Sequence, residues 1–163
     1  MTPARMDVDL ARALRTLLHE QRVGALGTLH GGEPYVSMVP FARVSSPIGF
    51  VIHVSRLAAH TKDMLESASV SLLVMAPPGT AGSAQALARV TIQGDARPLL
   101  AGGARHHEAK QAYLERFPDS EPMFGFSDFS LFEIVPRSLR FVGGFAQAKT
   151  LTPDGLAEIL QSD

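Results

Sequence analysis

A stripe of apolar residues with the period of a helix fills the N-terminal part of the chain. It consists of Leu10, Ala13, Leu14, Leu17 and Leu18. This spacing puts the five side chains on one face of a helix. The start of that helix is predicted at Thr2 and Pro3 or, alternatively, at Asp7. The stripe therefore predicts a helix that packs against the rest of the protein.

Two further helices are predicted at either end of the C-terminal third. Residues 104–117 repeat apolar positions at helical spacing and leave charged residues such as Arg105 on the outer face. His106 and His107 are neighbours there and point in different directions, so no metal site is predicted. Thr152 followed by Pro153 predicts the start of a short closing helix.

Strand patterns occupy most of the remaining chain. Residues 23–29 and 35–42 flank the Gly-rich turn H-G-G-E-P, which predicts a β-hairpin. Residues 69–76 are almost continuously apolar, which predicts a fully buried strand. Residues 87–100 alternate between apolar and polar, and Gly94 among them predicts a bulge.

The side chains of the second hairpin strand alternate between its two faces, which decides which of them a ligand could contact. Ser37 and Val39 fall on one face and Met38 on the other. Pro40 has no N–H to give to a ladder, which predicts an edge or a bulge at that end of the strand. Such an edge frees main-chain groups for a ligand, although Ser37 is equally explained as a half-exposed strand serine.

The last third of the chain continues the strand pattern. Residues 118–136 predict a loop that closes as a strand and carries a cluster of four aromatic side chains, Phe124, Phe126, Phe129 and Phe132. Residues 137–148 predict a final strand broken by Gly143 and Gly144. Short strands joined mostly by hairpins, with helices inserted between them, predict a mainly β (α+β) fold, an antiparallel barrel with peripheral helices.

The richest polar stretch is S-R-L-A-A-H-T-K, residues 55–62, where a predicted strand turns into a predicted helix. A helix start leaves N–H groups unpaired and carries a partial positive charge, so it favours anions. Hydroxyls, an imidazole and two fixed positive charges are added there by Ser55, Arg56, His60, Thr61 and Lys62. The stretch predicts an anion site. The alternative is that Ser55 only caps the helix and the other side chains are solvated.

Length and composition narrow the function classes. With 163 residues, a single domain over residues 1–163 is expected, and the formal net charge of −1 gives no reason to expect nucleic acid or a membrane surface as partner. Cysteine is absent, which excludes disulfides, thiolate metal sites and thiol nucleophiles. No apolar segment is long enough to cross a bilayer, and a cytoplasmic protein is expected.

The order of these pieces resembles the FMN-binding split-barrel superfamily, the pyridoxamine 5′-phosphate oxidase-like proteins, and is most similar to the branch that includes the haem-utilisation proteins. The matching pieces lie between Arg22 and Ala148 and read R-V-G-A-L-G-T-L, G-E-P-Y-V-S-M-V-P-F-A, S-R-L-A-A-H-T-K, S-V-S-L-L-V, R-V-T-I-Q-G-D-A and R-F-V-G-G-F-A. The resemblance implies an antiparallel split β-barrel that forms a homodimer with two FMN molecules at its interface, and a flavin-dependent oxidoreductase acting on a small molecule.

The same resemblance implies cofactor-binding roles for particular residues. Ser37, Met38 and Val39 would lie along the isoalloxazine and ribityl chain, and Arg89 would reach the flavin of the partner subunit. The end of the next strand would lie beside the cofactor and the following turn would hold its phosphate, with the residues Val54, Ser55, Arg56, His60, Thr61 and Lys62. No residue stands out as a general acid or base.

Departures from the family pattern leave other functions open. Ser37, His60 and Thr61 stand where pyridoxamine phosphate oxidases proper have arginine or lysine, so synthesis of pyridoxal phosphate is not expected. His53 and His60 are candidate haem ligands if the chain follows the haem-utilisation branch, whose usual further C-terminal domain is not expected at this length. A non-enzymatic haem- or flavin-binding module, or a dimeric interaction protein without a cofactor, are the alternatives.

Overall fold

The structure, a computed structural model, describes residues 7–162. Within them the chain forms four α-helices, α1 (Val8–Glu20), α2 (Ala59–Glu66), α3 (Ala104–Arg116) and α4 (Pro153–Gln161). The strands are β1 (Val23–His30), β2 (Glu33–Pro40), β3 (Ala42–Ser45), β4 (Ile48–Ser55), β5 (Ser69–Met75), β6 (Arg89–Pro98), β7 (Phe129–Val142) and β8 (Ala148–Leu151). Two short 3₁₀ segments, η1 (Ala84–Ala86) and η2 (Pro118–Gly125), lie in the connections. None of the helices in residues 7–162 is both long and apolar enough to span a membrane.

The strands form one coiled antiparallel sheet in the order β2-β1-β5-β6-β7-β4-β3, with β8 added alongside β7. Its two ends, β2 and β3, do not pair with each other within the described chain, so the sheet is not closed. The predicted antiparallel split barrel with peripheral helices is confirmed, as is the edge position predicted from Pro40. The predicted hairpin is β1–β2, and its two-residue turn requires positive φ at Gly31 and Gly32.

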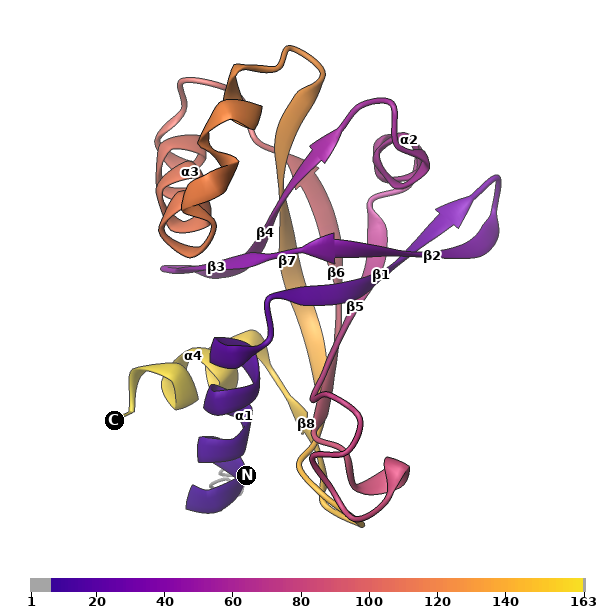
Figure 1. Cartoon of the computed structure of the whole chain (residues 1–163), viewed down its shortest axis with the longest axis vertical. Helices are drawn as coiled ribbons and strands as arrows, with labels where there is room; N and C mark the ends of the chain where they lie inside the picture. The colour runs from indigo at the N-terminus through magenta and orange to yellow at the C-terminus, as the bar shows by residue number, and fades with distance from the viewer. Residues whose placement is uncertain (1–6, 163) are drawn as a thin grey trace.

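Two helices close one end of the sheet. Figure 1 shows α1 and α4 side by side near both termini, on the opposite side of β3 from α3. The stripe predicted for α1 packs into the main core, where Leu14 and Leu18 are fully buried. This helix starts after Asp7, whose carboxylate accepts a hydrogen bond from the Asp9 amide at 2.8 Å, so the second predicted start is confirmed. Thr2 and Pro3 lie outside the described residues.

The prediction that residues 69–76 form a fully buried strand is wrong. In β5 burial alternates: Val70, Leu72 and Val74 are buried, whereas Leu73 is half-buried and Met75 is 40% exposed. The inner face of β5 covers the main core, whereas the outer-face residues Ser69, Ser71, Leu73 and Met75 are partly or largely exposed. An apolar strand is therefore left with one face uncovered, as on an antiparallel sheet with a single core side.

Two predicted C-terminal strands are in fact the single strand β7. The bulge predicted at Gly94 is confirmed, since Gln93 pairs with Ser138 but Gly94 with Pro136, which leaves Arg137 without a partner residue. A Cβ at Gly94 would overlap the backbone carbonyl of β7, so only glycine fits there. Because Pro136 lies at the interrupted part of the ladder, its missing N–H does not end the strand.

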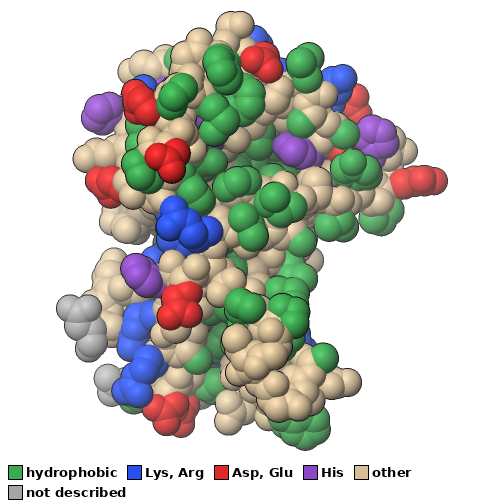
Figure 2. All heavy atoms as spheres, viewed as in Figure 1, with side chains coloured by type: hydrophobic (Ala, Val, Ile, Leu, Met, Phe, Trp, Pro, Cys, Tyr) green, Lys and Arg blue, Asp and Glu red, His purple; other side chains and the backbone are tan. Residues whose placement is uncertain are grey.

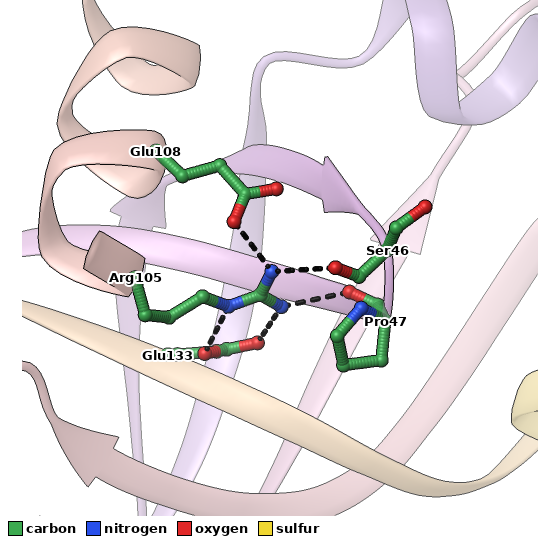
Figure 3. A network of polar contacts seen from close by, with 5 residues as sticks. All are labelled: Ser46, Pro47, Arg105, Glu108 and Glu133. Carbon is green, nitrogen blue, oxygen red and sulfur yellow. Dashed lines mark hydrogen bonds and ion pairs between the residues drawn. The ribbon is translucent and has the colours of Figure 1, made fainter.

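Arg105 was expected on the solvated face of α3, and this expectation is wrong. Its guanidinium pairs with both carboxylate oxygens of the buried Glu133 on β7, with Glu108, and with the carbonyls of Ser46 and Pro47 (Figure 3). The hydrogen bonds to Glu133, against a smaller effect of burial, raise the pKa of Arg105. This network holds α3 against β7 and the β3–β4 turn, because the planar guanidinium of one arginine donates hydrogen bonds to acceptors on all three.

Candidate functional site

The predicted turn from strand to helix lies between β4, which ends at Ser55, and α2, which begins at Ala59. The N-cap residue is Ala58 and makes no side-chain capping bond. The Ser55 hydroxyl donates to the Asp128 carboxylate at 2.8 Å and accepts from the Leu57 amide at 3.1 Å. Ser55 therefore ties the turn to the start of β7 and does not cap α2.

The other polar groups of this turn are also bonded within the protein. Thr61 is fully buried and its hydroxyl donates to the Ser55 carbonyl at 2.6 Å. The Arg56 guanidinium donates to the Ser127 carbonyl, and Lys62 is exposed on the surface of α2. An approaching phosphate would therefore meet two hydroxyls that are already bonded, the Asp128 carboxylate beside Ser55, and the positive charges of Arg56 and exposed Lys62. The phosphate-binding role of these residues stays a prediction.

Ser37 and His60 meet across the gap between β2 and α2. The Ser37 hydroxyl and His60 Nδ1 are hydrogen-bonded at 3.1 Å, and both side chains are half-buried. Burial lowers the pKa of His60, although the nearby Asp63 carboxylate opposes this. The neutral imidazole is thus favoured near pH 7. In the tautomer whose Nδ1–H donates to Ser37, the lone pair of Nε2 is available to a ligand or metal.

A buried carboxylate holds α2 against β1. Asp63 is 2% exposed and accepts from the Thr28 hydroxyl at 2.8 Å and from His30 Nδ1 at 2.7 Å. Burial alone would raise the pKa of Asp63, but the hydrogen bonds from Thr28 and His30 outweigh it and hold this pKa below its ordinary value. Because His60 lies three residues earlier on the same helix, Asp63 also sets where His60 stands.

Replacing Asp63 with asparagine is expected to lower the free energy of unfolding near neutral pH. It should also make that free energy depend less on pH. A carboxyl whose pKa is lower in the folded state stabilises that state above its unfolded pKa, and this stabilisation is lost as pH falls through the folded pKa. Urea unfolding between about pH 3 and pH 7 measures the slope. Glu66→Gln, an exposed change on the same helix, is the control. Equal slopes in Asp63→Asn and wild type would contradict the assignment.

The outer face of β1, β2 and β5 forms a shallow apolar groove of about 390 Å³. Its lining includes Val23, Ala25, Val36, Met38 and Met75, and apolar side chains are visible where these strands cross (Figure 2). Val36 and Met38 are 67% and 65% exposed. Large exposed apolar side chains in one place mark a contact surface for a ligand or a protein.

The remaining predicted cofactor residues are dispersed. Val39 and Val54 are buried in the main core, so their side chains face away from the groove that Met38 lines. The Arg89 guanidinium donates to the carbonyls of Gln85 and Leu87 in its own chain, at 3.0 and 2.9 Å. Of the ten predicted residues, the hydrogen bonds therefore join Ser37 with His60 and, separately, Ser55 with Thr61.

His53 is packed as an aromatic core residue. It is 8% exposed and its ring stacks on Phe124 with centroids 3.9 Å apart. Burial, then the charges of His106 and Lys110, lowers the pKa of His53 to about 4. The predicted aromatic cluster therefore forms around this imidazole, and Phe132 instead joins the main core. Phe124, Phe129 and Tyr113 all lie against the His53 ring, which leaves His60 the more accessible candidate ligand.

Sequence reasoning missed Asp63 and Asp128. Their partners Thr28 and Ser55 are 35 and 73 residues away in sequence, so no local sequence pattern predicts the roles of these two aspartates. An acidic residue on the buried side of a short amphipathic helix was the available signal for Asp63. None was present for Asp128.

Together these features define a split-barrel protein with a candidate cofactor surface formed by β1, β2, β5 and α2. The chain belongs to the pyridoxamine 5′-phosphate oxidase family, whose model matches residues 10–143. The resemblance to the haem-utilisation branch is confirmed by its relatives.

Two curated relatives have haem in their names. The chain is 36% identical over 140 residues to the chloroplastic non-canonical heme oxygenase HOZ of Arabidopsis thaliana. The matched residues are 83% of this chain and 40% of that protein. It is 25% identical over 158 residues to the heme oxygenase HutZ of Vibrio cholerae, covering 96% and 89%. Among solved structures, a heme binding protein from Mycobacterium smegmatis superposes with a TM-score of 0.81 at 27% identity, covering 91% of this chain and 60% of that one. The chain thus spans less than two thirds of the Arabidopsis and mycobacterial proteins.

Proposed function

We propose that this protein binds haem, as a homodimer, at the edge strand β2, between the apolar surface of β1, β2 and β5 and His60 of α2. The observation that carries the proposal is the pairing of Ser37 with His60. Ser37 is among the residues that line the groove, but its hydroxyl lies on the face of β2 opposite Met38, where it is bonded to Nδ1 of a neutral His60 imidazole across this edge strand. The names of the relatives support haem over the flavin that the sequence first suggested.

The residues present fit haem better than they fit FMN. Haem is a flat, largely apolar macrocycle whose iron accepts a neutral imidazole. Exposed Val36 and Met38 supply apolar contact area, and His60 supplies the imidazole. Of the residues expected to hold an FMN phosphate, Ser55 and Thr61 are bonded internally beside Asp128, while Lys62 stays exposed. Bound haem would supply iron for oxygen chemistry, as in the relatives named heme oxygenase.

A second copy of the chain is the proposed cover for the outer face. Each protomer leaves Val23, Val36 and Met38 more than one third exposed on adjoining strands. Burying such side chains is favourable by roughly 25 cal/mol per Å² of apolar area. Pairing would also exclude water from the groove and so protect a bound macrocycle.

Titration of the purified protein with hemin and, separately, with FMN tests this proposal. Hemin is expected to give a saturable Soret band with about one haem per protomer, and FMN no saturable change in absorbance or fluorescence. Light scattering is expected to give a dimer. Saturable FMN binding without saturable hemin binding would return the assignment to a flavoprotein.

The variant Met38→Glu tests whether the outer face of β2 forms the dimer contact. A charge on the outer face is expected to shift the dimer to monomer and to weaken hemin binding. Leu100→Glu makes the same change at a residue that is 84% exposed and lies between β6 and α3, so it should alter neither property. An unchanged dimer in Met38→Glu would place the contact elsewhere.

A further inference from the structure

A second hollow, which shares no lining residue with the β1–β2–β5 groove, lies where α1 and α4 meet the edge strand β3. It has a volume of about 330 Å³ and is lined by Arg15, Thr16, His19, Glu20, Arg43 and Leu160. Figure 2 shows this waist on the left of the molecule, with blue basic side chains and a histidine around it. None of these residues belongs to the proposed haem surface.

Arg43 is the central charge of the hollow. Its neighbours Ala42 and Val44 on β3 face the small core under α3, so the alternation of the strand turns Arg43 towards α1 and α4. Arg43 is half-buried, and burial lowers its pKa. Within residues 7–162 its guanidinium has neither a hydrogen bond nor an ion pair, which is unusual for a partly buried cation.

Further positive charge surrounds Arg43. Arg15 is anchored by a hydrogen bond from its guanidinium to the Ile159 carbonyl at 3.1 Å. Arg116 lies close enough that, after burial, the charge of Arg43 is the largest cause lowering the pKa of Arg116. Arg116 donates to carbonyls at the end of α1, and its Nε is buried without a partner among the described residues.

Negative charge does not balance this cluster. The one carboxylate lining the hollow is Glu20, which is exposed and forms no ion pair within residues 7–162. The hollow is at the small end of the size range of ligand pockets. Partly buried guanidinium groups bind phosphate and carboxylate groups by two parallel hydrogen bonds.

We infer that this hollow is a binding site for a small oxyanion, the phosphate or carboxylate group of a metabolite, held mainly by Arg43 with Arg15 at its rim. The site is independent of haem binding, because its residues come from β3, α1 and α4. A ligand there would join α1 and α4 to the edge of the sheet.

The test uses the ¹⁵N-labelled full chain titrated with potassium phosphate and, in a second arm, potassium succinate, each against potassium chloride at equal ionic strength. Saturable shifts of the amides of Thr16, His19 and Arg43 are expected with at least one oxyanion, and the two arms distinguish phosphate from carboxylate. Arg43→Gln should weaken that affinity by about ten-fold, the loss of a charged hydrogen bond.

Two variants complete the design. Arg12→Gln removes an equal charge from the exposed face of α1, where Arg12 pairs with Asp9, and should leave the affinity unchanged. Arg15→Gln should weaken binding and provides the measurement if Arg43→Gln does not fold. Shifts that match those of chloride, or equal affinities in wild type and the folded Arg43 or Arg15 variant, would overturn the inference.

Discussion

Replacing His60 with alanine is expected to reduce hemin affinity more than any other single substitution in this protein. The imidazole is held by Ser37 across the edge strand β2 from exposed Met38, and its loss would remove the proposed nitrogen ligand of the iron. Ser37→Ala should have a smaller effect of roughly ten-fold, because it removes only the group that orients the ligand. Hemin titration followed by the Soret band and by electron paramagnetic resonance measures both effects.

The pH dependence of hemin binding is a separate check on the same residue. Burial lowers the pKa of His60, so the ligating neutral form persists at pH 7 and is lost only as pH falls below the ordinary histidine range, about 6.5. Hemin should therefore dissociate on acidification in wild type. His107→Ala, at an exposed histidine of α3, is the matched control and should behave as wild type. If His60→Ala keeps the wild-type spectrum and affinity, another group holds the iron.

Arg105→Ala is expected to cause the largest loss of stability among polar substitutions. It leaves the carboxylate of Glu133, whose side chain is 8% exposed, without its main partner (Figure 3). Breaking a buried ion pair from one side typically costs about 3–5 kcal/mol in the free energy of unfolding. Urea denaturation monitored by circular dichroism measures this loss, and α3 should loosen first because the network fastens it.

Two comparisons make this prediction specific. Arg137→Ala removes the exposed pair with Asp95 and should cost less than about 1 kcal/mol. Replacing Arg105 and Glu133 together with methionine should recover much of the loss, since no unpaired charge then stays buried. A midpoint for Arg105→Ala equal to that of Arg137→Ala would show that the network contributes little.

Local features of this fold were predictable because they depend on residues close in sequence. The α1 stripe, the turn at Gly31 and Gly32 and the Thr152 cap each follow from the side chains and backbone preferences of a few neighbouring residues. The Gly94 bulge was also signalled locally, by a glycine inside a strand pattern, although the close carbonyl that requires it belongs to β7. The candidate site was predictable only in part. His60 was named as a phosphate contact and as an alternative haem ligand, and Ser37 as a flavin contact, but their bond to each other spans 23 residues and was not predicted.

The sequence alone determined most of the elements, their order and the split-barrel family, because hydrophobic period, turn residues and motif order depend on residues close in the chain. It did not reveal β3 and β8, and it divided β7 into two strands. The tertiary structure decided which polar groups are bonded within the protein and which are available to a ligand. Strand pairing brings Asp128 to Ser55 and Glu133 to Arg105, and it leaves Arg43 with no such partner among the described residues. Those outcomes depend on which distant strands become neighbours, and the charge or hydroxyl of one residue carries no information about the partner it will meet.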